Sequence, residues 1–568
     1  MTCVTRPSGW WMVPLLAVLG VGAAAAAELP LVQAVKTGDA NAVRTLLQQK
    51  VDVNTPEVDG MTALHWAANR NDLETVGLLI RAGANVKATN RLGVTPLALA
   101  CTAGTGAMVE QLLQAGVDPN SASAEGETAL MTAALAGNAD VLQVLLAHGA
   151  TVNAREAWRG QTALMWAAAE GHAEAIRTLI AAGADIHARA NPAPRANEGF
   201  TPLLFAVRDG HIDAVRVLLA AGADVNDRIV HKLLGNPATR ARGTPDEEGV
   251  TSALALAIIN AHYQLAAELL DHGADPNIND ARGSALHALT WMRNRGLPDG
   301  DEDHPPKPSG NLDSLELAKI LLTEGANPNA RIAWKEIPWA RNDGNTRAPP
   351  GIRIYRTYIS DVGATPFYLA AKQGDAPLMR LLVEYGAHPQ LATAQNVTPL
   401  MAAAGLGYYD GESPSPSTDL LETERLEAVK LAWELGGDVN AATDFGIASI
   451  EGDSLALLYD YYDYPDNLLG APETAVGDVR WDGMTALHGA ANMSEQHSII
   501  EFLVEKGARL DARNKLGWTP LMLTEGVKVN TVNYAPGAAE LLRRLMRERN
   551  LDPELYSQKG YQGREPRK

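Results

Sequence analysis

The phrase GMTALHWAA at Gly60–Ala68 is repeated as GMTALHGAA at Gly483–Ala491, with eight of the nine residues identical. Variants of this phrase begin at Gly93, Gly126 and Gly160, so the first four copies are spaced by 33, 33 and 34 residues. Further variants begin at Gly199, Gly249, Gly283, Gly363, Asn396 and Gly517. A constant spacing of this size indicates an array in which one small structural unit recurs along the chain.

The residues of each unit predict two helices. A threonine before an apolar run is a good N-cap, and the proline that often follows it suits the first helical turn. A second phrase accompanies the first at a fixed distance, as in LLIRAGANV at 78–86 and LLQAGVDPN at 112–120. We expect a second helix, such as Leu73–Arg81, that ends near Gly83, because glycine suits a left-handed C-cap. No single unit can bury its apolar face alone, so stacking of units provides the core.

These motifs resemble the ankyrin repeat, which has a period of 33 residues and a T-P-L-H-x-A signature. The stretches Thr62–His65 and Thr485–His488 are close copies of the signature, and the resemblance covers about residues 30 to 550. It implies an all-α ankyrin-repeat solenoid of about twelve helix-turn-helix units with β-hairpin-like fingers. It also implies that the histidines of the phrase, His65, His287 and His488, form structural hydrogen bonds.

The expected organisation follows from the positions of the phrases. The segments are a signal peptide at 1–27, an N-terminal capping repeat at 28–59, ankyrin repeats with finger insertions at 60–362, repeats at 363–446, an acidic tyrosine-rich insertion at 447–482, repeats and a C-terminal cap at 483–550, and a polar tail at 551–568. The last second-helix phrase, LLRRLMRERN, is rich in arginine, which suits the outer face of a terminal cap.

The departures from the period fall mainly at one phase of the repeat. Extra residues follow the D-x-N phrase and precede the next glycine-led phrase, at His187–Glu198, Asp227–Glu248, Ala330–Val362 and Ile447–Asp482. This is the finger position, and insertions on one face of a solenoid often mark its binding face. Two other insertions, at about 297–311 and 407–418, fall between the helices of a unit.

The finger insertions are rich in aromatic and charged residues. Residues 331–358 carry six basic and two acidic side chains, whereas residues 447–482 carry eight acidic side chains and one arginine. Aromatic residues and arginine are enriched at protein interfaces. The candidate partner-binding residues are Trp158, Arg240, Arg242, Trp334, Trp339, Arg341, Arg353, Tyr355, Tyr358, Tyr461, Tyr462 and Tyr464. Alternatively, the basic and acidic fingers pack on each other and close the groove.

The sequence contains no recognisable catalytic or cofactor-binding motif. C-x-x-C, H-E-x-x-H, G-x-S-x-G and P-loop patterns are all absent, and we expect no cofactor and no metal site. Cys101 falls on an expected inner helix and is interpreted as a core residue. The formal charge of −19 argues against nucleic acid as a partner. We therefore expect no enzyme activity, while an active site within the long insertions remains a minor alternative.

The first residues have the layout of a secretory signal peptide. An apolar run from about Trp10 to Val21 follows Arg6 and ends in the alanines Ala23–Ala27. We expect cleavage near Glu28 and a periplasmic or secreted protein. An uncleaved membrane anchor is the alternative.

The sequence thus predicts a non-enzymatic scaffold that binds a macromolecular partner, expected to be a protein, through its finger and concave face. The overall pattern resembles long exported ankyrin proteins of bacteria. The alternative is an accessory protein that binds a small ligand or glycan through the tryptophans and tyrosines of its fingers. The oligomeric state and the identity of the partner do not follow from the sequence.

Overall fold

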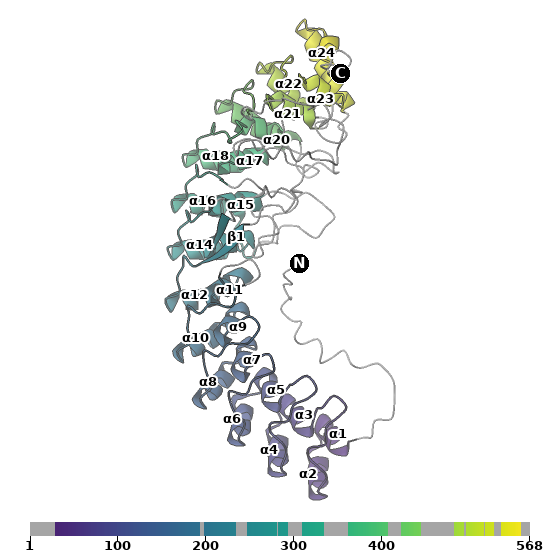
Figure 1. Cartoon of the computed structure of the whole chain (residues 1–568), viewed down its shortest axis with the longest axis vertical. Coiled ribbons are helices and arrows are strands. Elements are labelled where there is room, and N and C mark those ends of the chain that lie inside the picture. The colour runs from purple at the N-terminus through teal and green to yellow at the C-terminus, as the bar shows by residue number, and fades with distance from the viewer. Residues whose placement is uncertain are drawn as a thin grey trace, which may run out of the picture. The chain divides into compact units, whose positions relative to one another are not determined.

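The structure is a computed structural model of the chain. It describes residues 29–192, 198–233, 247–280, 282–293, 309–333, 362–406, 422–444, 482–493, 496–515, 517–526 and 535–557. The chain divides into two compact units, Met1–Ile229 and Val230–Lys568. Each unit is a row of paired helices (Figure 1).

The first unit contains six helix pairs in its described residues. They are α1 (Pro30–Thr37) with α2 (Ala40–Gln48), α3 (Ala63–Asn69) with α4 (Leu73–Arg81), α5 (Pro96–Ala103) with α6 (Gly106–Gln114), α7 (Ala129–Leu135) with α8 (Ala139–Ala147), α9 (Ala163–Ala169) with α10 (Ala173–Ala181), and α11 (Pro202–Asp209) with α12 (Ile212–Ala220). Helix α4 has the bounds that the sequence predicts.

The second unit also contains six helix pairs where the structure describes it. They are α13 (Ala253–Ile259) with α14 (Tyr263–Asp271), α15 (Ala285–Met292) with α16 (Ser314–Thr323), α17 (Pro366–Lys372) with α18 (Ala376–Glu384), α19 (Pro399–Ala403) with α20 (Glu422–Glu434), α21 (Ala486–Asn492) with α22 (His497–Glu505), and α23 (Pro520–Thr524) with α24 (Pro536–Glu548). Two paired strands, β1 (Arg228–Leu233) and β2 (Glu247–Ser252), begin within the expected 227–248 finger insertion, and β2 continues into the glycine-led phrase that follows it.

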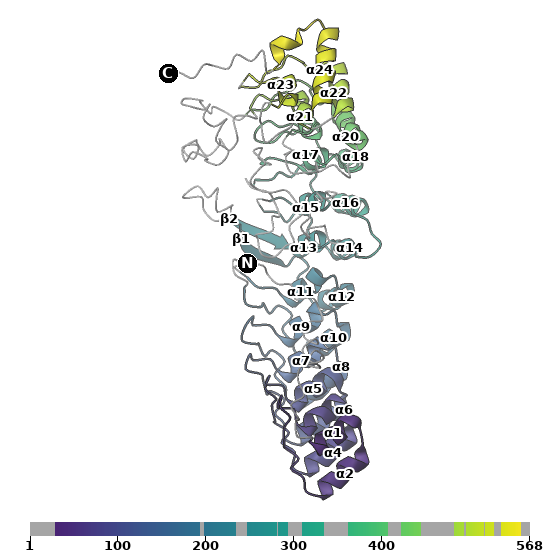
Figure 2. The same cartoon turned by 90° about the vertical axis from the view of Figure 1, so that its right-hand side faces the viewer.

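Within each unit the pairs stack in register. The first helices of successive pairs contact one another, as α3 contacts α5 and α5 contacts α7, and the second helices do the same. We call these two rows the inner and the outer helices, and Figure 2 shows them side by side. The described residues therefore confirm the expected solenoid of about twelve helical units.

The inner helices begin as the sequence predicts. The Thr95 hydroxyl accepts a hydrogen bond from the Ala98 amide at 3.1 Å, and Pro96 occupies the first helical turn. The outer helix α4 is followed by Gly83 at φ +88°, a left-handed conformation that glycine adopts without strain. Gly60, at φ +87°, has a second constraint, because a Cβ there would lie 2.9 Å from the Arg91 amide of the next finger.

The asparagine of the D-x-N phrase connects neighbouring repeats at six junctions of the described chain. Its Nδ2 donates to the carbonyl of the glycine that follows the next outer helix, at 2.9–3.1 Å, and its Oδ1 accepts from the amide two residues further on, at 2.7–2.9 Å. We call this pair of bonds an amide rung. The rungs join Asn54 to Gly83, Asn120 to Gly149, Asn153 to Gly183, Asn277 to Gly325, Asn329 to Gly386 and Asn440 to Gly507. The aspartate of the phrase orients the asparagine, as when Asp52 accepts from the Asn54 amide at 2.9 Å.

Two junctions of the first unit lack the rung in the described residues, one where His187 stands in place of the asparagine and one at Lys87. Lys87 stands in the place of the asparagine, so nothing in the described residues bonds the Gly116 carbonyl or the Asp118 amide in this way.

Neighbouring fingers are elsewhere joined by a backbone hydrogen bond, as when the Arg91 amide donates to the Asp59 carbonyl at 2.9 Å. No such bond joins the finger after α4 to the finger after α6 in the described residues. The third repeat, α5 and α6, is therefore held to the second by helix packing and by side-chain bonds. Asn71 Oδ1 accepts from the Thr105 amide at 3.1 Å, and His65 Nε2 lies 3.1 Å from the Val94 carbonyl.

The histidines of the phrase have the structural role that the family resemblance implies. The Nδ1 atom of His488 accepts from the Thr485 amide at 3.1 Å, and its Nε2 lies 3.1 Å from the Trp518 carbonyl of the following repeat. Because Nδ1 accepts, Nε2 carries the proton, and the ring is neutral. His287 has the equivalent bonds, and burial lowers the pKa of both histidines to about 4.

A buried ion pair fixes the second strand of the finger insertion. The guanidinium of Arg282 donates to the Asp280 carboxylate, at 2.7 Å for the shortest bond, and to the Thr251 hydroxyl at 3.1 Å. The same carboxylate accepts from the Val250 amide at 2.6 Å. The side chains of Arg282 and Asp280 are 1% and 2% exposed, so loss of either partner would leave a buried charge uncompensated.

The expected polar tail at 551–568 needs correction at its start. Residues Pro553–Tyr556 form a 3-10 helix that contacts α24, and Pro553 and Ser557 are buried. The Thr519 hydroxyl donates to the Tyr556 carbonyl at 2.6 Å, so this segment completes the last repeat. The cap arginines are also partly engaged, because Arg544 pairs with Glu501 at 2.6 Å.

Lys87→Asn should supply the rung that the junction at Lys87 lacks. The new amide would reach the Gly116 carbonyl and the Asp118 amide, and we expect the free energy of unfolding to rise by about 1 kcal/mol. Urea unfolding followed by circular dichroism measures this change. Lys87→Ala, which removes the lysine without adding an amide, should show no gain. An equal gain in both variants would contradict the rung.

The array should lose stability in mild acid. The buried histidines stay neutral in the folded chain down to about pH 4, whereas in the unfolded chain they take up protons below about 6.5. Their contribution to the free energy of unfolding is therefore complete above pH 6.5. It is lost as the pH falls towards 4, by about 3 kcal/mol for each histidine. Urea unfolding at a series of pH values measures the loss.

The comparison of two variants isolates the buried ring. His488→Gln should be less stable at pH 7 but should lose less stability on acidification than the unchanged chain. The exposed His187 is the matched control. In His187→Gln the free energy of unfolding should depend on pH as it does in the unchanged chain. If the free energy of unfolding of both variants changes equally with pH, the buried His488 ring is not the cause of the acid sensitivity.

Candidate functional site

The sequence-predicted site residues divide by whether the structure describes them. Trp158 is described, and its side chain is 70% exposed. The other candidates lie outside the described residues: Arg240, Arg242, Trp334, Trp339, Arg341, Arg353, Tyr355, Tyr358, Tyr461, Tyr462 and Tyr464. The choice between partner binding and mutual packing of the long fingers therefore stays a prediction.

The two units differ in how much of their inner helices is accessible. In the second unit every residue of α13, α15, α17, α19, α21 and α23 is buried. In the first unit the inner helices keep an exposed side, with Trp66, Thr132 and Trp166 partly accessible. A partner that binds along inner helices can thus reach those of the first unit.

Aromatic side chains recur at one position of these inner helices. The fourth residue after the N-cap is Trp66 in α3, Trp166 in α9 and Phe205 in α11. Lys36 lies 4.3 Å from the centroid of the Trp66 ring, and Arg208 lies 5.2 Å from that of Phe205. Aromatic rings with neighbouring cations are common at protein interfaces.

The fingers of the first unit are tight turns beside these helices (Figure 2). In the finger after α4, the Asn90 amide donates to the Val94 carbonyl at 3.0 Å, and the Asn90 Oδ1 accepts from the Leu92 and Val94 amides at 2.9 Å. Val58 and Leu92 are 71% and 75% exposed at the tips of two fingers. The finger turns thus expose apolar side chains on a fixed backbone.

The finger at Glu156–Gln161 is one residue longer than the turn at Asn90–Val94. Its Glu156 amide donates to the Gln161 carbonyl at 3.0 Å, which closes the turn over the extra residue. The Glu156 carboxylate is 6% exposed and accepts from the amides of Trp158, Arg159 and Gln161 at 2.6, 2.7 and 2.9 Å. A longer acceptor side chain replaces asparagine because the turn is wider.

This finger presents Trp158 and Arg159 as a stacked pair. The Arg159 guanidinium lies 4.4 Å from the centroid of the Trp158 ring. Neighbouring fingers hold the backbone on both sides, since the Ala157 amide donates to the Glu125 carbonyl at 2.8 Å and the Asn191 amide donates to the Arg159 carbonyl at 2.5 Å. The pair is therefore exposed on a rigid turn. We name Glu156–Gln161 the tryptophan finger.

A second finger has a glutamate at the same position but uses it differently. The Glu57 carboxylate accepts from the Trp66 indole Nε1 at 2.7 Å and from Lys36 at 2.5 Å. In the tryptophan finger the Glu156 carboxylate is occupied by backbone amides. The Nε1 of Trp166, which corresponds to Trp66, is buried without a hydrogen-bond partner in the described part of the chain.

The sequence singles out Trp158 as a candidate binding residue, whereas Glu156 and Arg159 are seen beside it only in the structure. The available signal was the spacing, because the finger between Asn153 and Gly160 has one residue more than the finger between Asn120 and Gly126. A glutamate at the start of a wider turn was the second signal. Both are local features of one repeat, which a search for long insertions passes over.

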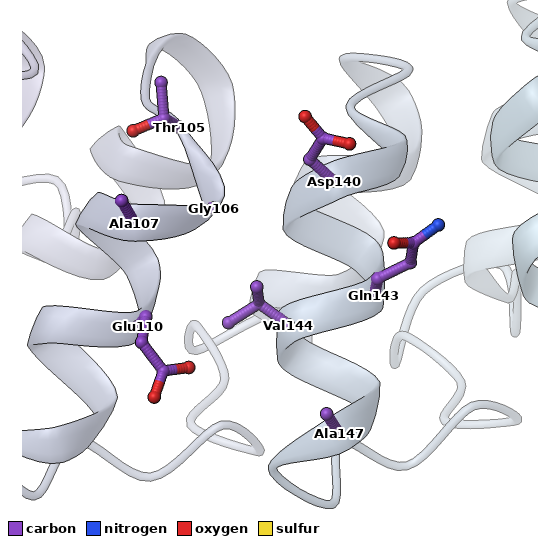
Figure 3. A pocket seen from close by; sticks show the side chains of 8 residues that line it. All are labelled: Thr105, Gly106, Ala107, Glu110, Asp140, Gln143, Val144 and Ala147. Atoms are coloured by element: carbon purple, nitrogen blue, oxygen red, sulfur yellow. The ribbon is translucent and has the colours of Figure 1, made fainter.

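The outer face has a shallow groove between α6 and α8 (Figure 3). It is lined by Thr105, Gly106, Ala107, Glu110, Asp140, Gln143, Val144 and Ala147. His148 lies 2.8 Å from Glu110, and this hydrogen bond lowers the pKa of the Glu110 carboxyl. The groove is open and its carboxylates do not converge, so it does not have the form of a catalytic site.

The described residues contain no arrangement suited to catalysis by a nucleophile or a metal. Cys101 lies in α5 with no exposed surface, and burial raises the pKa of its thiol to about 12. No group of three or more His, Cys, Asp or Glu side chains in the described ranges could hold a metal ion. Among the same residues, no helix is long and apolar enough to cross a membrane.

Comparison with known families agrees with this geometry. The model for ankyrin repeats in three copies matches residues 15–90, 31–123, 64–156, 97–190, 155–229 and 195–280, and the single ankyrin repeat model matches 362–394 and 482–515. No curated protein matches the chain. Repeated matches along the chain, together with the paired helices and their histidine caps, show that it belongs to the ankyrin repeat family.

Proposed function

We propose that this chain is a non-enzymatic scaffold that binds a protein partner through the fingers and inner helices of its first unit. Ankyrin repeats generally mediate protein–protein interaction, so a protein partner follows from the family. The observation that carries the choice of surface is the tryptophan finger, where Trp158 is 70% exposed on a turn fixed by three bonds to Glu156.

Binding costs free energy when flexible side chains and loops become ordered at the interface. A large exposed aromatic side chain loses little further freedom on binding when its backbone is already rigid. Tryptophan and arginine are the residues most enriched among those that dominate binding energy. The partly exposed Trp66 and Trp166 of α3 and α9 extend this surface along the inner helices. Leu92 and Val58 add apolar contacts at neighbouring finger tips.

The binding surface can be mapped with a photo-crosslinking amino acid. Placed at Leu92, which is 75% exposed on a finger, it should capture a protein from the organism's own extract. Placed at Gln143, which is exposed on the outer helix α8, it should capture little. Mass spectrometry of the adducts identifies the partner. Equal capture at both positions would contradict the proposed surface.

The same experiment separates the alternative function. An exposed indole also stacks on sugar rings, so a glycan ligand is the second candidate, supported by the exposure of Trp158. If the ligand is a glycan, the crosslinker at Leu92 should label no protein. A glycan array probed with the full chain should then show binding that Trp158→Ala abolishes.

We also propose that the protein is exported. The support is the sequence alone, in which Arg6 precedes an apolar run that ends in Ala23–Ala27. The mature chain, purified from the organism, should begin at or near Glu28 when its N-terminus is sequenced. Recovery of an intact Met1 in the membrane fraction would favour the anchor instead.

A further inference from the structure

The tryptophan finger carries one cation, Arg159, and Arg155 directly precedes the finger. Arg159 forms no ion pair in the described part of the chain, although other arginines of the first unit do, such as Arg177 with Glu174 at 2.8 Å and Arg189 with Asp227 at 2.6 Å. Arg155 donates instead to the carbonyls of Gly160 and Arg189, at 2.9 and 2.6 Å. The Arg159 guanidinium is thus an exposed cation that no carboxylate of the described residues contacts directly.

The nearest carboxylate in sequence, Glu156, forms no ion pair with Arg159 and is directed to the backbone of the turn instead. Both oxygens of Glu156 accept backbone amides, and the group is 6% exposed. The accessible group without an ionic partner is therefore the Arg159 guanidinium, and a ligand that supplies a carboxylate is its chemical complement.

We infer that the tryptophan finger binds a partner segment in which a carboxylate adjoins an apolar side chain. This inference rests on the proposed function and specifies the chemistry of the partner. The carboxylate meets the planar guanidinium of Arg159 in a two-bond contact, which arginine makes better than lysine. The apolar side chain packs on the Trp158 indole, beside the guanidinium that already stacks there.

A carboxylate-bearing peptide fits better than a polyanion. The whole chain carries a formal charge of −19, which repels an extended polyanion such as nucleic acid at long range. A single carboxylate is recognised by a short contact that depends on the local guanidinium. Sugar hydroxyls would use the indole face but would not require the charge of Arg159.

The test uses the full chain and a display library of short random peptides. The unchanged chain should select peptides in which Asp or Glu adjoins an apolar residue. Arg159→Gln should lose the acidic preference, and its affinity for a selected peptide should fall at least tenfold, as for other interface anchors. Arg159→Lys keeps the charge but loses the planar guanidinium, so its affinity for the peptide should lie between those of Arg159→Gln and the unchanged chain. Trp158→Ala should weaken all selected peptides.

Matched controls make the result specific. Arg177→Gln removes an exposed arginine on the outer helix α10 and should leave selection unchanged. Because Trp158 and Arg159 are both exposed, the melting temperature of each variant should stay within a few degrees of the unchanged chain.

The outcomes separate the inference from the proposed function. Selected peptides without acidic residues, or equal selection by Arg159→Gln and the unchanged chain, would overturn the inference and leave protein binding intact. If no peptide is selected while crosslinks from Leu92 still capture a protein, the acidic-peptide chemistry is wrong. Failure of both experiments would remove the proposed function as well.

Discussion

The amide rung between repeats is the interaction on which the rest of the array depends. Each asparagine satisfies a carbonyl and an amide of the next repeat, so it fixes the spacing and rotation of neighbouring units. One such pair of exposed bonds contributes only about 1–2 kcal/mol. Its effect is geometric, because the inner helices can bury their apolar faces only when successive repeats are in register.

The rung also explains where the chain tolerates extra residues. Asn329 bonds Gly386 at 2.9 Å, and Asn440 bonds Gly507 at 3.0 Å, although long insertions follow both asparagines in sequence. The rung holds the segment from the outer helix to the asparagine against the next repeat, and these bonds do not depend on the length of the finger that follows. Insertions at the finger therefore leave the register of the stack unchanged, which accounts for their common phase.

The sequence predicted the parts of the structure that repeat. Threonine caps and glycine ends follow from the local chemistry of one unit and recur in the others. The role of buried histidines such as His488 was implied by the resemblance to the ankyrin repeat. Features of a single repeat were harder to predict. The role of Glu156 depends on a turn one residue longer than its neighbours, and the ordering of Pro553–Tyr556 depends on contacts with α24. The candidate binding residues predicted in the long insertions lie outside the described residues.

The junction at Lys87 has a consequence for how the first unit comes apart. Stability in a linear array is the sum of terms between neighbours, so a weak interface divides it into blocks that open separately. We therefore expect the helices α1–α4, which lie ahead of the junction, to open as one block before α5–α12. Protease cleavage near Lys87 would then occur without global unfolding. The tryptophan finger lies in the block that remains.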